Sequence, residues 1–404
     1  MLQRSAQERS SLETLLPVYL DFQATTPLDQ RVLERMLPFL SGPVGNPHST
    51  SHLHGVSASK AVEAAREQIA ALIGATPEEI VFTSGATEAN NLLIRGAFQG
   101  KESAGKKSMV TSSAEHKSIL EIAARLGASG SDVRMVSINS EGMIEPDQLA
   151  AAIDDTTTLV SIMAVNNEIG VVQPLAELAN KARSRGAWFH TDAAQAIGKI
   201  RVNATDFDMA SISSHKLYGP AGIGAAFMAR RLRKRIEPLL LGGGQEGGLR
   251  SGTLPVALCV GFGAACEIAS VEMEKEAFRL LELRDQFIAI LRDRGVAFEI
   301  NGSLKRRIAG NLNIYFPGVD AEALLMRVRN TISLSTGSAC TAESLEPSHV
   351  LLALGLGTER AEESVRIGFG RSTTAAEILI AADALTKAVA ALAKVGYKAP
   401  NMER

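Results

Sequence analysis

The chain has 404 residues, with 42 Lys and Arg against 44 Asp and Glu, and it is 46% hydrophobic and 21% charged. Its formal net charge of −2 gives no general electrostatic reason to bind nucleic acid or an anionic membrane. The length suggests about two or three domains. With 35 glycines and 4% aromatic residues, the composition fits an α/β enzyme with many strand-to-helix turns better than a β-sandwich.

The number of cysteines and the length of the apolar segments indicate the cellular compartment in which the protein is expected. The chain has three cysteines, Cys259, Cys266 and Cys340, and none forms a CxxC pair. An odd number in a long chain argues against a disulfide framework and favours a reducing, cytoplasmic setting. Residues 1–17 lack the apolar core of a signal peptide, and the nearly apolar stretch 254–266 is too short to span a bilayer. We therefore expect no membrane segment.

The first half of the chain predicts a large α/β unit. We expect residues 1–17 to form a loose arm, followed by a strand at 18–22 and a helix at 31–40. A long Gly/Pro/Ser/His loop comes next. It leads into a helix at 57–74 that Ser57 can cap. Apolar strands then alternate with amphipathic helices, which favours a mainly parallel, seven-stranded sheet covered on both faces. The expected strands are 78–85, 107–113, 132–138, 157–165, 187–192, 208–214 and 222–229, with helices at 86–98, 117–127, 146–153 and 175–186.

In the last third of the chain the regular alternation of strands and helices ends, which predicts a second, smaller α+β domain. A long helix at 256–295 leads into it. We place the large domain at 18–270 and the small one at 271–404, with the start of the chain contributing to the small domain. The expected strands here are 296–301, 311–316, 331–335 and 364–370, and the expected helices are 321–328, 347–355 and 374–394.

Polar groups follow five of the predicted strands. In an open α/β sheet, ligands bind at the carboxyl ends of the strands. Each group alone is usually a helix cap or a solvated side chain, but five on one rim indicate a binding site. The groups are Ser84 to Thr87, Glu115 with His116, Asn166 to Glu168, Asp192 with Gln195, and Ser213 to Lys216.

The chemistry of this rim suits pyridoxal phosphate. SGATEANN at 84–91 joins a strand to a helix, where backbone N–H groups favour an anion; the alternative is an ordinary helix start with Thr87 as its cap. A Schiff-base lysine, Lys216, and a carboxylate for the pyridine nitrogen, Asp192, match that cofactor. Thr87 and Ser213 can supply hydroxyls to the phosphate, and His116 can stack on the ring and relay protons. Neither a P-loop nor a dinucleotide fingerprint is present.

Ten ordered motifs between about residues 17 and 395 resemble those of the group I cysteine desulfurases, the NifS/IscS type of the class V aminotransferase-like family. The resemblance implies a fold-type I, pyridoxal-phosphate-dependent homodimer. It also implies that L-cysteine is converted into L-alanine, with the sulfur left on the enzyme as a persulfide. The motifs are VYLDFQATTP, GNPHSTSH, FTSGATEANN, SAEHKSIL, VNNEIGVVQP, FHTDAAQAIGK, SSHKLYGPAGIG, RSGTLPV, STGSACTAESLEPSHVL and SVRIGFGR.

Residue roles follow from the same resemblance. It implies that Lys216 is the Schiff-base lysine, that Cys340 accepts the sulfur and that Arg366 binds the substrate carboxylate. The other implied contacts are Asp192 with the pyridine nitrogen, His116 over the ring, Asn167 and Gln195 near the phenolic oxygen, Ala86, Thr87, Ser213 and His215 at the phosphate, and Thr253 from the other subunit. Asn167 is also expected beside the substrate, and no metal is expected.

The three cysteines have different surroundings. Cys340 lies in a Ser/Thr/Gly-rich stretch between a predicted strand and helix, and the chemistry needs a mobile loop there to carry the thiol between substrate and acceptor. Only the thiolate attacks sulfur, so a nearby cation or helix N-terminus is expected to help ionise it. Cys259 and Cys266 lie seven apart in an apolar helix, and we predict that both are core residues.

The sulfur acceptor stays open at this stage. The chain ends soon after its last predicted helix, whereas housekeeping members of the family carry a longer tail that docks the iron–sulfur scaffold. The acceptor is a protein of iron–sulfur cluster assembly, or of thio-cofactor or tRNA thiolation. Alternative functions are a selenocysteine lyase, another fold-type I enzyme such as an aminotransferase, or a partner-dependent sulfur-relay subunit.

Overall fold

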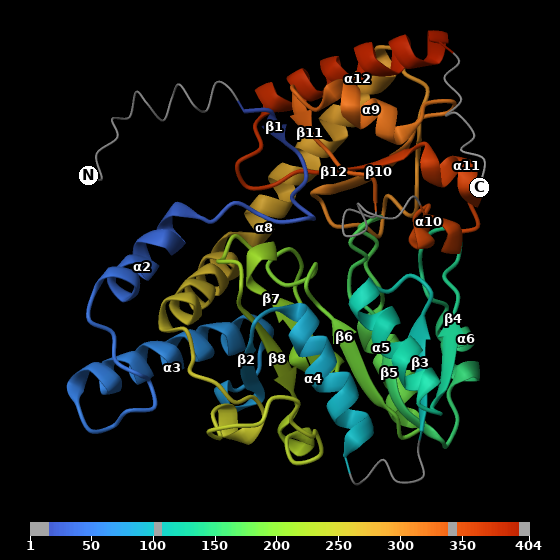
Figure 1. Cartoon of the computed structure of the whole chain (residues 1–404). Coiled ribbons are helices and arrows are strands. Elements are labelled where there is room, and N and C mark those ends of the chain that lie inside the picture. The colour runs from blue at the N-terminus through green and yellow to red at the C-terminus, as the bar shows by residue number, and fades with distance from the viewer. Residues whose placement is uncertain (1–15, 101–106, 338–345, 396–404) are drawn as a thin grey trace.

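A computed structural model describes residues 16–100, 107–337 and 346–395, and its larger part is built on a seven-stranded sheet (Figure 1). The strand order is β2-β8-β7-β6-β5-β3-β4, and β8 alone runs antiparallel to both neighbours. The mainly parallel sheet expected from the sequence is confirmed. Its strands are β2 (Ile80–Thr83), β3 (Ser108–Ser112), β4 (Asp132–Val136), β5 (Thr157–Ser161), β6 (Trp188–Asp192), β7 (Met209–Ser213) and β8 (Gly224–Met228).

Helices cover both faces of this sheet because alternate strand residues point to opposite sides. Met109 packs with the core under α4 and α5, whereas its neighbour Val110 packs with the core on the other face. Leu159 and Val160 divide in the same way. The helices of this part are α2 (Gln30–Ser41), α3 (Leu53–Ile73), α4 (Ala86–Gln99), α5 (Lys117–Ala128), α6 (Pro146–Ala152), α7 (Leu175–Ser184) and the first half of α8 (Val256–Asp293).

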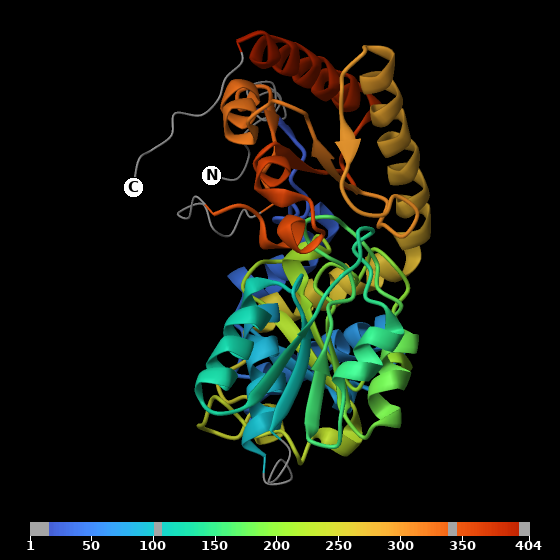
Figure 2. The ribbon, with the colours of Figure 1, turned by 90° about the vertical axis from the view of Figure 1, so that its right-hand side faces the viewer.

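The smaller part lies above the sheet and contains its own apolar core (Figure 2). A three-stranded antiparallel sheet has the order β12-β10-β9, and β1 pairs in parallel with β11. The start of the chain therefore lies with the C-terminal elements. These elements are β1 (Val18–Tyr19), β9 (Glu299–Ile300), β10 (Asn311–Tyr315), β11 (Ile332–Ser333), β12 (Ser364–Gly368), α9 (Ala321–Val328), α10 (His349–Ala353), α11 (Gly357–Glu362) and α12 (Ala375–Val395).

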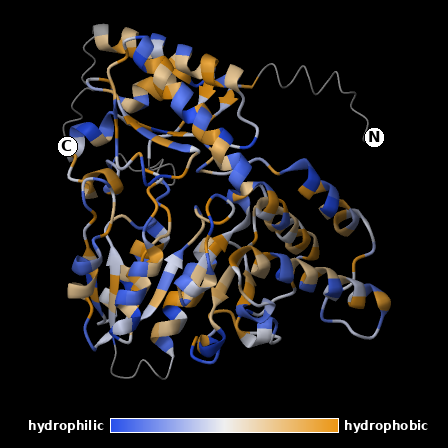
Figure 3. Ribbon diagram, turned by 180° about the vertical axis from the view of Figure 1, so that it is seen from behind, coloured by the Kyte–Doolittle hydropathy of each residue, from blue (hydrophilic) through white to orange (hydrophobic). Residues whose placement is uncertain are grey.

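Helix α8 joins the two parts. Its first half packs into the core beside α3, and its second half contributes Phe287 and Leu291 to the core of the smaller part. By length and composition α8 could cross a membrane, but 61% of its apolar window is buried inside the molecule. Cys259 and Cys266 are free, fully buried thiols, which confirms that both are core residues. Figure 3 shows hydrophilic and hydrophobic residues side by side along the outer helices, as expected for helices with one buried face.

One helix start differs from its sequence expectation. Helix α3 begins at Leu53, and its cap is His52, whose side chain accepts a hydrogen bond from the backbone N–H of Gly55. Ser57 is therefore not the cap. Glycine is unfavourable inside a helix, so Gly55 led us to assign this segment to the preceding loop. In the structure, a Cβ at this position would lie 2.0 Å from the carbonyl oxygen of Ser49. Close packing of the preceding loop requires the glycine.

Candidate active site

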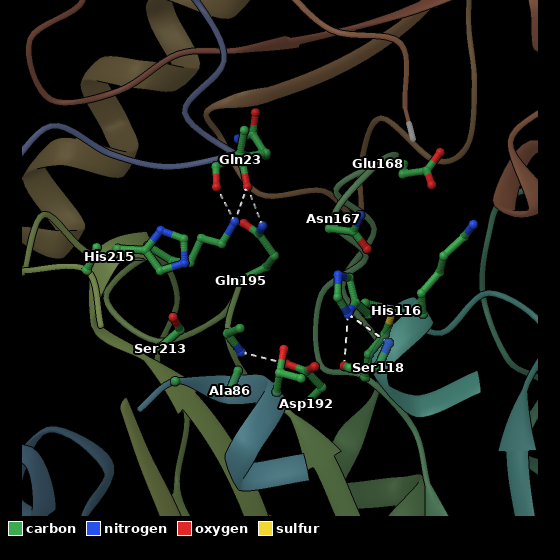
Figure 4. A pocket seen from close by; sticks show the side chains of 18 of the residues that line it. Gln23, Ala86, His116, Ser118, Asn167, Glu168, Asp192, Gln195, Ser213 and His215 are labelled. Carbon is green, nitrogen blue, oxygen red and sulfur yellow. Dashed lines mark hydrogen bonds between the residues drawn. The ribbon is translucent and has the colours of Figure 1, made fainter. Parts of the chain in front are cut away.

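The five polar strand ends meet around one cavity of about 480 Å³ at the carboxyl edge of the large sheet (Figure 4). Elements of the smaller part close it from above through Arg366 on β12, Gly337 and His349. Parallel neighbours place their carboxyl ends at the same edge, which is why these distant segments converge. Of the predicted site residues, the cavity wall contains Ala86, Thr87, His116, Asn167, Asp192, Gln195, Ser213, His215, Lys216 and Arg366.

The turn between β2 and α4 presents the start of a helix to the cavity. Gly85 is the N-cap, and its φ of 155° is a conformation that favours glycine. Gly224 on β8 lies directly against it, because a Cβ on Gly224 would be 2.7 Å from the Gly85 Cα. The cap has no side-chain hydrogen bond, so Thr87 is not the cap. The first N–H groups of α4, beginning at Ala86, have no partner within the helix and can bind an anion.

Asp192 is the last residue of β6 and is 5% exposed. Both of its carboxylate oxygens accept hydrogen bonds. The Asn90 Nδ2 donates to Oδ2 at 2.9 Å, and the Ala194 backbone N–H donates to Oδ1 at 3.0 Å. These two donors fix the plane of the carboxylate at the floor of the cavity (Figure 4).

Lys216 ends a short 3₁₀ turn, Ser214–Lys216, that follows β7. Its Nζ donates to the carbonyl oxygens of Gln23 and Ala24, at 2.7 and 2.5 Å (Figure 4). The Thr26 hydroxyl donates to the carbonyl oxygen of His215 at 2.9 Å. The segment after β1 therefore holds the lysine turn in place and receives its amine.

His116 is the N-cap of α5, and its Nδ1 accepts from the Ser118 backbone N–H at 3.2 Å. The Ser118 Oγ lies 2.8 Å from the same nitrogen (Figure 4). The preceding Glu115 is fully buried, and burial raises the pKa of its carboxyl well above the usual value. Its Oε1 accepts from the Met163 backbone N–H at 2.8 Å, so Glu115 supports the wall behind the histidine.

Gln195 is held by both ends of its amide. Its Nε2 donates to the carbonyl oxygen of Gln23 at 2.9 Å, and its Oε1 accepts from the Lys199 Nζ at 2.6 Å. Burial, together with the charge of Lys216, lowers the pKa of Lys199 to about 7. Burial and the same two lysines lower the pKa of His215 to about 4, so this imidazole is neutral at pH 7.

Arg366 is an almost completely buried cation, with 2% of its surface exposed. Its Nη2 donates to Asp21 Oδ1 at 2.8 Å, and its Nη1 donates to the Asn167 carbonyl oxygen at 3.1 Å. Its Nε has no hydrogen-bond partner among the described residues. A buried guanidinium that lines a cavity can bind an anion, and its planar fork suits a carboxylate.

Two predicted residues are not among the described residues that line this cavity. Thr253 is exposed in the loop before α8, and that loop is tied to the start of α4 by an ion pair of 2.8 Å between Arg250 and Glu88. Because the resemblance implies that Thr253 serves the other subunit, its position in one chain leaves that role a prediction. Cys340 lies outside the described residues. The described residue nearest to it in the sequence is Gly337, which lines the cavity.

Three contributors to the site were not predicted. Asp21 pairs with Arg366 across 345 residues, and the carbonyl oxygen of Gln23 receives both Lys216 and Gln195. Neither contact leaves a local signal in the sequence. Asn90 does leave a local signal in the sequence, because asparagine is a poor helix former and this one lies in the interior of α4. Such a residue in a predicted helix indicates a side chain that is retained for its hydrogen bonds.

Comparisons with known proteins identify the family. The family model described as aminotransferase class-V matches residues 18–380. "Cysteine desulfurase, mitochondrial" of Arthroderma benhamiae is 51% identical over 369 residues, covering 90% of this chain and 72% of that protein. "Cysteine desulfurase IscS" of Rickettsia akari is 47% identical over 384 residues, covering 94% and 93%. A solved structure titled "NifS-like protein" has a TM-score of 0.85 at 34% identity and covers 94% of this chain and all of its own.

The fold is thus that of the class-V aminotransferases, and the chain belongs to that family. Within the family, the identities and coverage place it among the cysteine desulfurases of the NifS/IscS type.

Proposed function

We propose that the chain is a pyridoxal-phosphate-dependent cysteine desulfurase that converts L-cysteine into L-alanine and leaves the sulfur on Cys340. The observation that supports this proposal is the set of groups that line one cavity. It brings together the Lys216 amine, the Asp192 carboxylate, a helix N-terminus and the buried Arg366. The amine can bind the cofactor aldehyde, and the carboxylate can pair with the pyridine nitrogen. The helix N-terminus can hold the phosphate, and the arginine can bind the carboxylate of an amino acid.

The residues present fit the cofactor. Gly85 leaves open space where another residue would carry a Cβ, so a phosphate can approach the α4 backbone next to Ala86 and Thr87. The Ser213 hydroxyl and His215 line the same cavity. Asp192 would hold a proton on the pyridine nitrogen, His116 would lie against the ring, and the Gln195 amide would donate to its phenolic oxygen. When bound, pyridoxal phosphate supplies an electron sink for the substrate carbon atoms.

The substrate is positioned by its carboxylate. Arg366 and Asn167 both line the cavity, and the Arg366 Nη1 donates to the Asn167 carbonyl oxygen. Asp21 accepts from Nη2, so the guanidinium keeps a fixed orientation before substrate arrives. A bidentate contact to the carboxylate would then fix the amino acid in the cavity.

The chain's own groups account for the proton and sulfur transfers. The Lys216 Nζ removes the proton from the substrate Cα, and the backbone oxygens of Gln23 and Ala24 hold that amine when it is free. The Cys340 thiolate attacks the substrate sulfur, a new S–S bond forms and the Cβ–S bond breaks. The electron pair of the broken bond stays with the substrate, whose Cβ takes a proton to give alanine. His116 would move protons between the ring side of the cavity and the thiol.

The enzyme is proposed to act as a homodimer. Its support is the exposed loop that ends in Thr253, together with Leu241, which is 82% exposed in the same loop region. Packing that loop on a second copy would bury the leucine and bring Thr253 to the partner's cavity. Light scattering on the purified protein tests this, with a dimer mass expected and a monomer mass at micromolar concentration contradicting it.

The acceptor and the compartment belong to the same proposal. We infer that the persulfide sulfur passes to an acceptor protein of iron–sulfur cluster, thio-cofactor or tRNA-thiolation chemistry, in a reducing compartment such as the cytoplasm. The two free thiols of α8 support a reducing setting. One named relative is mitochondrial, so a mitochondrial location is the alternative to the cytoplasm.

The proposed activity is tested by measuring alanine release from L-cysteine in the presence of a thiol reductant. Wild type is expected to release alanine, and Lys216→Ala is expected to release none, because it removes the amine that binds the cofactor and takes the Cα proton. Continued full turnover by Lys216→Ala would contradict the assignment. A strong preference for L-selenocysteine over L-cysteine would favour the selenocysteine lyase reading instead.

A further inference from the structure

A chain of buried hydrogen bonds connects Asp192 with His116 through two side chains that the proposed mechanism does not use. Asn90 is fully buried on α4, and its Nδ2 lies 2.9 Å from Asp192 Oδ2 and 3.0 Å from Ser118 Oγ. The Ser118 Oγ is in turn 2.8 Å from His116 Nδ1. We propose that Asn90 and Ser118 are positioning residues that hold His116 with its proton on Nε2 and tie that state to the orientation of Asp192. The inference deepens, and rests on, the proposed function.

The orientation of the Asn90 amide follows from its neighbours. A carboxylate only accepts hydrogen bonds, so the NH₂ end of the amide must face Asp192. The Asn90 Oδ1 is then left buried without a hydrogen-bond partner among the described residues. An unpaired buried acceptor is unfavourable, which means that the position is not optimised for stability. It provides two N–H donors, and both are used.

The direction of the remaining hydrogen bonds follows in turn. The Ser118 Oγ accepts a hydrogen bond from the Asn90 Nδ2, so its own hydroxyl proton is available to His116 Nδ1. The Ser118 backbone N–H also donates to that nitrogen, at 3.2 Å. With two donors directed at it, Nδ1 acts as an acceptor, and the proton of the neutral imidazole is on Nε2.

This arrangement gives His116 a defined role at a defined atom. His116 lines the cavity with Nδ1 occupied within the protein, so Nε2 would be its hydrogen-bond donor toward a bound cofactor or substrate. The same Asn90 amide donates to the carboxylate proposed for the pyridine nitrogen. A disturbance of Asn90 therefore reaches both groups at once, although Asn90 itself does not line the cavity.

The relay is tested by the ¹⁵N shifts of the His116 side chain in histidine-labelled protein, with and without pyridoxal phosphate. The chain has seven histidines, and the signal lost in His116→Gln identifies the right one. Wild type is expected to show protonated Nε2 and a hydrogen-bonded Nδ1. Asn90→Leu and Ser118→Ala are each expected to shift the Nδ1 signal, although the first does not touch His116. Asn91→Leu is the matched control, since Asn91 lies next in α4 and bonds only its own helix, through Thr87.

Kinetics provide the second measurement. Removing the relay should lower kcat by about tenfold, part of the general acid–base contribution, with KM changed less than about threefold. A His116 that carries its proton on Nδ1, or an Nδ1 signal unmoved in both variants, would overturn the proposal. Because Ser118 is only partly buried, Ser118→Ala still decides the question if Asn90→Leu does not fold. Wild type inactive toward cysteine would refute the proposed function alone, because the shifts are measured without substrate.

Discussion

Replacing Arg366 separates substrate binding from the rest of the chemistry. The side chain lines the cavity and is 2% exposed, and its Nε has no hydrogen-bond partner among the described residues. Arg366→Gln removes the cation and the fork that would receive the substrate carboxylate. Two hydrogen bonds to a charged group, each contributing about 1.5–3 kcal/mol, correspond to a loss of about 10²–10⁴-fold in kcat/KM. We expect most of this loss in KM, because the carboxylate contact is the same before and during the reaction.

The assay is initial-rate alanine release across a range of L-cysteine concentrations, compared with Arg366→Lys. Lysine keeps the charge but not the planar fork, so its kcat/KM should fall between those of wild type and the glutamine variant. Thermal unfolding must be followed in parallel, because Asp21 loses its partner in Arg366→Gln. A glutamine variant that folds and keeps kcat/KM within about fivefold of wild type would refute the role of Arg366 as the carboxylate site.

Two further predictions concern the cofactor cradle and acid stability. Gly224→Ala places a Cβ 2.3 Å from the Ile212 carbonyl oxygen and 2.7 Å from the Gly85 Cα. It should therefore weaken pyridoxal phosphate binding at least about tenfold in a titration. Gly127→Ala is the control and should leave binding unchanged, because its Cβ would meet only a side chain at 3.8 Å. Burial lowers the pKa of His190 from 6.5 to about 4, and the unfolded chain therefore takes up its proton first as the pH falls. This histidine should remove up to about 3 kcal/mol of unfolding free energy between pH 6.5 and 4, and urea unfolding of wild type that shows no loss across this window would contradict it.

Much of the site could be predicted because its signals are local. Ser84 to Thr87 and Ser213 to Lys216 directly follow apolar strands, and the carboxyl ends of parallel strands meet at one edge. Residues that act at such an edge are therefore visible from strand assignment alone. Cys259 and Cys266 were equally readable as core, because their seven-residue spacing keeps them on one face of an apolar helix.

The rest depends on contacts that no local pattern encodes. Asp21 and Arg366 meet because β1 and β12 come together in the smaller part, and the Gln23 contact to Lys216 uses a backbone oxygen that any residue would supply. The start of α3 was missed for a related reason. Gly55 lowers helix propensity, but tertiary packing against Ser49 requires it. In each case packing between distant segments outweighs the local signal.

The central claim, that sulfur leaves cysteine through a persulfide on Cys340, is tested most directly by one comparison. Alanine release from L-cysteine is measured for wild type and Cys340→Ser, with Cys259→Ser as the matched control in the α8 core, where the thiol is buried away from the cavity. Wild type and Cys259→Ser should release alanine, and Cys340→Ser should release almost none while it still binds the cofactor. Equal alanine from wild type and Cys340→Ser would remove Cys340 from the reaction and contradict the claim.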